Sequence, residues 1–372
     1  MDTKFAYWVP NVSGGLVISS WPQKTDWNYE YNKNLAQTAE NVGFDYALAQ
    51  ARFFGSYGAD RQLEALSVAN ALAANTEKLN LIGAVHPGLW HPGPIANYVS
   101  TAEHITNGRF HLNVVSGWFK GEFTQFGEVW LDHDERYERS EEFIKSLKGL
   151  WTEKEFSFNG RFYRFDQAPS EPKPRQVPEI FQGGNSIRAR KMAARVSDWL
   201  FINGGSLEYI KGVIRDVRRF ADEFGTKPPK IGVNGFVIAR ETEAEAKREL
   251  EGIIENATEE AVEGFKKQVR EAGQSSPEGE GMWADSDFRD LIQYNDGFKT
   301  GLIGTKDQVV ERIQQLDALG VDLILTGFLH YDEDLEHFGK EIIPAVRQAE
   351  SLKPEAQESA GVEQQKAASF PF

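Results

Sequence analysis

The 372-residue sequence contains no cysteine, so disulfides, thiolate metal ligands and cysteine nucleophiles are excluded. Basic residues are scarce relative to acidic ones: 41 Lys and Arg stand against 56 Asp and Glu, which gives a formal net charge of −15. A surface with this charge repels phosphate groups. The composition therefore argues against nucleic acids and anionic membranes as partners.

Long apolar runs are also missing, since no stretch approaches the roughly 20 residues that a membrane-spanning helix needs. The polar start over residues 1–4 does not resemble a secretory leader. With 40% apolar and 12% aromatic residues, the chain can nevertheless bury a large core. We expect a folded, soluble protein of the cytoplasm.

Short apolar runs alternate with amphipathic stretches over residues 1–350, which is typical of βα units. Eight such units fit a closed (β/α)8 TIM barrel with insertions better than an open α/β sheet of six or seven strands, which remains the alternative. The sequence predicts strands over Phe5–Val9, Phe44–Ala49, Leu79–Val85, Phe110–Val115, Glu179–Gln182, Trp199–Ile202, Ile231–Ala239 and Asp322–Gly327.

Three segments fall outside the repeat. Residues 11–28 form a long first loop, residues 154–177 indicate a small β excursion, and residues 258–300 form an insertion interpreted as a long loop. In a barrel, the first loop and the insertion would both lie at the C-terminal rim, where such enzymes bind their ligands. Residues 351–372 are predicted to be a disordered tail.

Two strand ends carry polar residues suited to a ligand. The predicted strand Phe110–Val115 carries Asn113 near its end and runs into Ser116, Gly117 and Trp118, and an amide at this position offers donors and an acceptor to a heteroaromatic ring. The alternative is a capped strand end. The run from Gln182 to Ser186 precedes a helix, whose free N–H groups would favour a phosphate, although an ordinary helix start remains an alternative.

Histidines at other strand ends are weaker candidates. His330 follows the eighth strand and is a candidate proton donor, or a hydrogen-bonded strand-end residue. His86 and His91 flank a loop after the third strand and either line a pocket or cap a turn. His133 lies between two aspartates, but adjacent residues do not converge on one metal ion, so we predict no metal site. The Gly-x-Gly-x-x-Ala spacing at 279–284 follows no strand and is interpreted as a loop.

Taken together, these motifs resemble the luciferase-like superfamily of flavin-dependent monooxygenases, and within it the FMNH2-dependent dimethylsulfone monooxygenases. The resemblance extends over about residues 4–349. It rests on KFAYWVPNVSGG at 4–15, NVVSGWFKGEF at 113–123, HDERYERSEEF at 133–143, EIFQGG at 179–184, ARVSDW at 194–199 and QYNDGFKT at 293–300.

The resemblance implies a role for each matching residue. Asn113 and Ser116 would face the flavin ring or its peroxide, Glu122 would lie near the polar edge of the ring, and Ala51 and Arg52 would approach it from the loop after the second strand. The ribityl phosphate would be held by Arg136, Tyr137, Gly184, Asn185 and Ser186. Trp8 and His330 join Asn113 as catalytic candidates, Trp8 by excluding water. Candidates for the substrate pocket are Trp118, Asn234, Phe236 and Phe328.

The resemblance also implies an activity: a two-component monooxygenase that uses FMNH2 and O2 to convert dimethyl sulfone to methanesulfinate and formaldehyde. A separate NAD(P)H:FMN reductase would supply the FMNH2, and we expect a homo-oligomer, either a dimer or a tetramer. Asn234 and Phe236 stand where sulfonate-oxidising relatives carry an arginine and a histidine, which favours a small neutral substrate. The alternatives are a sibling oxygenase for another sulfone or a nitrogen heterocycle, and a flavin-binding protein without catalytic activity.

Overall fold

The computed structural model describes residues 3–55, 57–273, 283 and 285–352. Eight parallel strands close into a barrel, because β9 pairs with both β8 and β11. Going round the barrel, the strands are β1 (Lys4–Val9), β2 (Tyr46–Ala49), β3 (Asn80–Val85), β4 (Phe110–Val114), β7 (Ile180–Gly183), β8 (Trp199–Ile202), β9 (Lys230–Ala239) and β11 (Leu323–Phe328). The predicted (β/α)8 barrel is confirmed, and the open sheet is excluded.

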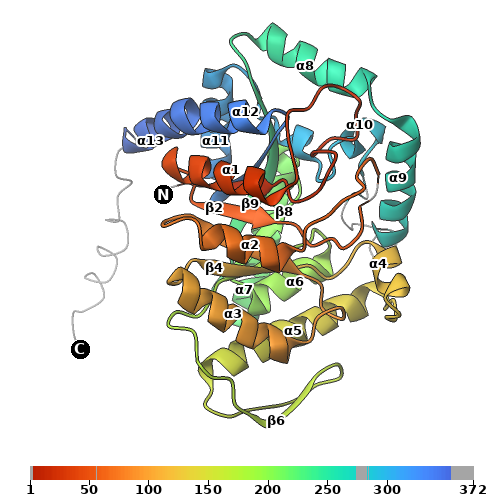
Figure 1. Cartoon of the computed structure of the whole chain (residues 1–372), viewed down its shortest axis with the longest axis vertical. Coiled ribbons are helices and arrows are strands. Elements are labelled where there is room, and N and C mark those ends of the chain that lie inside the picture. The colour runs from red at the N-terminus through yellow and green to blue at the C-terminus, as the bar shows by residue number, and fades with distance from the viewer. Residues whose placement is uncertain (1–2, 56, 274–282, 284, 353–372) are drawn as a thin grey trace, which may run out of the picture.

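Helices surround this barrel (Figure 1). Those that follow barrel strands are α1 (Tyr29–Asn41), α2 (Ala65–Ala73), α3 (Pro92–Thr106), α4 (Lys120–Gln125), α5 (His133–Thr152), α6 (Ile187–Val196), α7 (Leu207–Phe224), α8 (Glu243–Glu255) and α11 (Lys306–Leu319). After β11 come α12 (Tyr331–His337), the π-helical turn η2 (Phe338–Ile342) and α13 (Ile343–Ser351). No helix in the described part of the chain is both long and apolar enough to span a bilayer.

Large side chains fill the lower part of the barrel interior. Phe181, Trp199 and Phe201 form a stack, with ring centroids 5.1 Å and 5.3 Å from Phe181. They pack with Ala6, Leu48, Ile82, Leu323 and Leu325 into a buried cluster separate from the one beneath the helices. Because this cluster fills the barrel interior on the side away from the C-terminal strand ends, a ligand can enter only at the mouth that those strand ends form.

The segments outside the repeat lie where the sequence predicts them, with one correction. Residues 156–168 form the hairpin of β5 (Phe156–Asn159) and β6 (Arg164–Ala168). The insertion is not simply a loop, because it begins with α9 (Glu259–Gly273), which stands beside the barrel in Figure 1. Val262, Phe265 and Val269 recur at helical spacing and are buried.

The described later part of the insertion, residues 285–300, returns across the barrel mouth. It contains α10 (Phe288–Leu291) and the 3-10 turn η1 (Gly297–Thr300), and is followed by the short strand β10 (Ile303–Gly304), which pairs with β9. The first loop meets it through a bridge between Val17 and Gln293. Both segments therefore cover the C-terminal rim, as predicted. Most of the predicted tail, residues 353–372, lies outside the described residues.

Candidate active site

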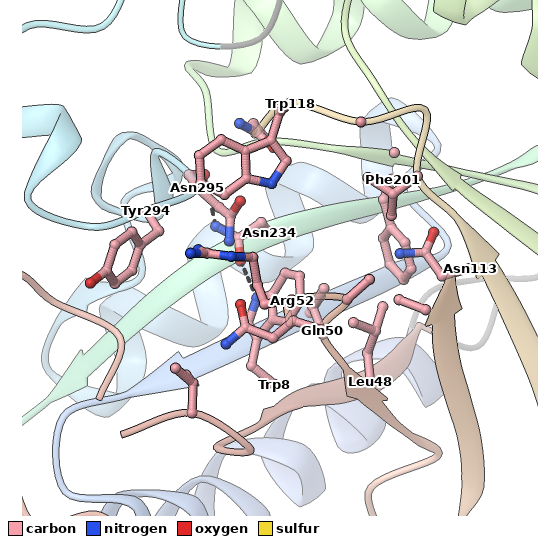
Figure 2. Close-up of a pocket in the computed structure, with 18 of the residues that line it drawn as sticks. Trp8, Leu48, Gln50, Arg52, Asn113, Trp118, Phe201, Asn234, Tyr294 and Asn295 are labelled. Carbon is pink, nitrogen blue, oxygen red and sulfur yellow. Dashed lines mark hydrogen bonds between the residues drawn. The ribbon is translucent and has the colours of Figure 1, made fainter. Parts of the chain in front are cut away.

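A cavity with an empty volume of about 1120 Å³ opens at the barrel mouth (Figure 2). Its floor consists of side chains from the barrel strands, and its roof comes from the loop after β4 and from the insertion. Lining residues of the floor include Trp8, Leu48, Ala84, Asn113, Phe201, Asn234 and Leu325. Those of the roof include Trp118, Phe265, Trp283, Tyr294 and Asn295. A largely apolar wall with a few polar groups is typical of a site for a small organic molecule.

Three polar groups in this lining are buried without a hydrogen-bond partner among the described residues. They are Oδ1 of Asn113, Oγ of Ser116 and Nδ2 of Asn203. Asn113 lies in β4, Ser116 follows that strand and Asn203 follows β8, so the three groups approach the cavity from two different strands. Because buried polar groups are nearly always satisfied, these atoms indicate that the cavity accepts a polar ligand.

The turn before α6 forms another part of the wall, at Gly183. Gly184 has a φ of +144°, and a Cβ there would lie 2.7 Å from the Tyr137 hydroxyl oxygen, so only glycine allows this approach. Ser186 caps α6 by accepting a hydrogen bond from the backbone N–H of Ala189 at 3.2 Å. Tyr137 lines the cavity and forms a side-chain hydrogen bond with Ser186. Burial raises the pKa of Tyr137, so its hydroxyl remains a donor at neutral pH.

Trp8 and Asn234 are linked across the cavity floor. The indole N–H of Trp8 donates to Oδ1 of Asn234 at 2.6 Å, and Nδ2 of Asn234 donates to the backbone oxygen of Asn295 at 2.9 Å. The link with Trp8 appears as a dashed line in Figure 2. The chain of hydrogen bonds joins β1, β9 and the insertion, so it fixes the roof over the floor.

Arg52 enters the cavity beside Trp118 and Asn234 (Figure 2). Its Nε donates to Oε1 of Glu122 at 3.0 Å, and its guanidinium carbon lies 5.0 Å from the centroid of the Trp118 ring. Glu122 is fully buried, does not line the cavity and also accepts from the backbone N–H of Phe53 at 2.9 Å. Glu122 thus contacts Arg52 from behind the cavity wall, and its predicted position near the polar edge of the flavin stays a prediction.

His86 lies behind the same wall rather than in it. Its ring nitrogens are 3.0 Å from the backbone oxygen of Val115 and 3.1 Å from that of Ala51, both of which line the cavity. Burial lowers its pKa. His91 instead caps α3, where its Nδ1 accepts from the N–H of Gly93 at 3.1 Å. His86 positions the wall and His91 caps a helix, so neither lines the cavity.

Three further predicted residues do not reach the cavity. Arg136 is buried against the ring of Trp130, with a separation of 4.2 Å from guanidinium carbon to ring centroid. Phe236 packs edge-on against Phe298 of the insertion at 5.3 Å, which keeps it away from the opening. Phe328 contacts residues beneath the outer helices, because side chains alternate along β11 and Leu325 is the one that faces inward.

His330 is also outside the cavity. Its Nδ1 accepts from the backbone N–H of Lys24 at 3.3 Å, and its Nε2 lies 3.2 Å from Oε1 of Glu249. It lines a separate polar depression with Arg240 and Asp334. The predicted role in proton transfer is therefore not supported, because the chain turns outward after β11, and His330 instead ties the first loop to α8.

The structure adds residues that the sequence analysis did not single out. Gln50 and Asn203 line the cavity directly after β2 and β8, and their position at strand ends is the signal that could have identified them. Tyr294 and Asn295 come from the insertion and occur within QYNDGFKT, for which no role was predicted. Asn185 lines a neighbouring depression with Arg190 rather than the main cavity.

Comparison with known proteins agrees with this barrel and its site at the mouth. A family described as luciferase-like monooxygenase matches residues 3–323. An FMNH2-dependent dimethylsulfone monooxygenase of Pseudomonas putida is 58% identical, with coverage of 93% of this chain and 96% of the relative. One from Pseudomonas fluorescens is 56% identical, with coverage of 94% and 95%. The crystal structure of DmoA from Hyphomicrobium sulfonivorans superposes with a TM-score of 0.78, at 21% identity and coverage of 96% and 90%.

Fold and site together define a (β/α)8 barrel enzyme with a cavity suited to a small organic molecule at the mouth of its barrel. The chain belongs to the luciferase-like monooxygenases, and the resemblance inferred from its motifs is confirmed.

Proposed function

We propose that this enzyme is an FMNH2-dependent monooxygenase of dimethyl sulfone. The balanced reaction is (CH3)2SO2 + O2 + FMNH2 → CH3SO2H + HCHO + FMN + H2O. The high identity to two dimethylsulfone monooxygenases over nearly the whole chain supports it. The structural observation that best supports the proposal is the largely apolar cavity, which contains buried polar groups without a hydrogen-bond partner among the described residues. The positive charge of Arg52, which lines this cavity, is paired with Glu122.

The residues present fit FMN. Asn113 and Ser116 would hold the polar edge of its ring, since Oδ1 and Oγ have no other described partner. Tyr137 and Ser186, with the backbone of the glycine turn at Gly184, would hold the phosphate, because the turn leads into the N-terminus of α6. When bound, reduced FMN supplies the electrons that activate dioxygen.

The protein's own contribution is to orient the substrate and exclude water. Trp8, Trp118 and Trp283 form apolar walls around the cavity, which limits wasteful reaction of the reduced cofactor with oxygen in solvent. Gln50 projects a half-buried amide into the cavity, and its side chain has no hydrogen-bond partner among the described residues. This amide can donate to a sulfone oxygen and so turn one methyl group towards the cofactor.

The cofactor would arrive by diffusion from a separate NAD(P)H:FMN reductase. The two Pseudomonas relatives are named for their dependence on FMNH2, which such a reductase produces. We place the enzyme in the cytoplasm, where NAD(P)H is available, and expect it to form a dimer or tetramer.

The test is product analysis with purified enzyme, an FMN reductase, NADH and a panel of dimethyl sulfone, methanesulfonate and uracil. We expect stoichiometric formaldehyde and methanesulfinate from dimethyl sulfone only. Oxidation of uracil instead would favour the alternative of a nitrogen-heterocycle substrate. A pyrimidine monooxygenase of Acinetobacter baylyi is 28% identical to this chain, with coverage of 93% of this chain and 95% of the relative. Flavin binding without any product would favour the non-catalytic alternative.

A further inference from the structure

Arg52 is the one charged residue among the described residues that line the cavity. Its side chain is held rigidly, since Nη2 donates to the backbone oxygen of Phe54 at 2.9 Å and the guanidinium carbon lies 5.0 Å and 4.9 Å from the ring centroids of Trp118 and Phe119. A rigid cation in an apolar cavity would ordinarily be an anion-binding group. What it contacts on its other side decides whether it acts as one here.

Glu122 lies on that other side and is fully buried. Its Oε1 accepts from Nε of Arg52 at 3.0 Å and from the backbone N–H groups of Phe53 and Phe54 at 2.9 Å and 3.3 Å. Three donors on one oxygen fix the carboxylate in place. The pair therefore presents an almost neutral dipole to the cavity instead of a free positive charge.

We propose that Glu122 determines the substrate class: by neutralising Arg52 it restricts the cavity to neutral molecules and excludes sulfonates. This inference rests on the proposed function and specifies the selectivity of that same site. A sulfonate must lose its hydration to enter the cavity, and only an uncompensated cation repays that loss. A neutral sulfone of similar shape loses far less, so the same cavity accepts it. Selectivity then comes from a feature that disfavours the wrong ligand.

The decisive variant is Glu122→Gln, which is isosteric and keeps one oxygen for the three donors but removes the compensating charge. Methanesulfonate is the probe, as an inhibitor of dimethyl sulfone turnover and as a ligand in calorimetry with the apo and FMN-loaded protein. We expect its inhibition constant and dissociation constant to fall at least ten-fold relative to the wild type.

Two controls isolate the pair. Glu128→Gln removes the same charge from an exposed position a few residues along the chain, and we expect no change in methanesulfonate binding. The double variant Arg52→Gln with Glu122→Gln makes the pair neutral again, and the gain should disappear. An unchanged constant in Glu122→Gln would overturn the proposal, as would a double variant that binds methanesulfonate as tightly as Glu122→Gln.

The wild type provides a test that needs no variant to fold. We expect its inhibition constant for methanesulfonate to exceed its KM for dimethyl sulfone at least a hundred-fold, and comparable values would overturn the proposal. Failure of the proposed function is a separate result: the wild type would then not oxidise dimethyl sulfone, while calorimetry would still report whether removing Glu122 creates an anion site.

Discussion

Gly204 offers a sharp test of how the insertion completes the site. It follows β8, and its backbone N–H donates to the backbone oxygen of Asn295 at 2.9 Å. A Cβ at this position would lie 1.8 Å from the backbone oxygen of Asp296. The variant Gly204→Ala therefore forces the neighbouring segment to retreat by roughly 1 Å, because backbone atoms cannot bend aside as a flexible side chain does.

The magnitude follows from what that segment carries. Tyr294 and Asn295 form part of the cavity roof, and Asn295 accepts the hydrogen bond from Asn234. Losing this bond and the one from Gly204 costs about 1–3 kcal/mol, and a displacement of 1 Å at a reacting site lowers turnover on the order of 100-fold. We expect Gly204→Ala to keep its fold, because the barrel strands are untouched, but to lose most of its activity.

The assay combines three readouts: the circular dichroism spectrum, quenching of tryptophan fluorescence by FMNH2 under anaerobic conditions, and formaldehyde release. Gly212→Ala is the matched control, since it lies within α7 and a Cβ there meets no atom within 4 Å. We expect the control to equal the wild type in all three. Full activity in Gly204→Ala would refute the claim that the docked insertion shapes the site.

Three further predictions follow from the site. The double variant Tyr137→Phe with Ser186→Ala should weaken FMNH2 binding, by about 1.5–3 kcal/mol for each charge-assisted bond lost, in an anaerobic titration. Gln50→Leu should raise KM for dimethyl sulfone about ten-fold and leave FMNH2 affinity unchanged; an unchanged KM would remove Gln50 from the substrate site. Burial raises the pKa of Asp296 from 3.8 to about 6. The folded protein therefore binds this proton more tightly than the unfolded chain, and stability should fall by up to about 3 kcal/mol as pH rises from about 4 to about 6. Between these pH values the melting temperature of the Asp296→Asn variant should therefore decline less than that of the wild type. An equal decline in both proteins would contradict the assignment of this effect to Asp296.

The fold could be predicted because each barrel strand is a short apolar run between amphipathic stretches. Strand-end residues such as Asn113, which lies at the cavity, followed from the same logic, since parallel strands end at one rim. The position of His330 could not be obtained this way, because the turn after β11 carries it outward to Glu249. The pairing of Arg52 with Glu122 joins residues 70 positions apart, and no local pattern reports such a contact.

The insertion shows a different limit. α9 was missed because the Gly- and Ser-rich composition of the later part of the insertion hid the spacing of Val262, Phe265 and Val269. The contribution of Tyr294 depends on how the insertion folds back over the mouth, which its composition does not determine.

The account depends most directly on where the cofactor binds, and a crystal structure of the enzyme with FMN and dimethyl sulfone measures this. It should show the flavin ring against Asn113 and Ser116, the phosphate at the turn before Ser186, and the sulfone near Gln50. A cofactor bound outside the barrel mouth, or one with its phosphate at the opposite end of the cavity, would contradict the account.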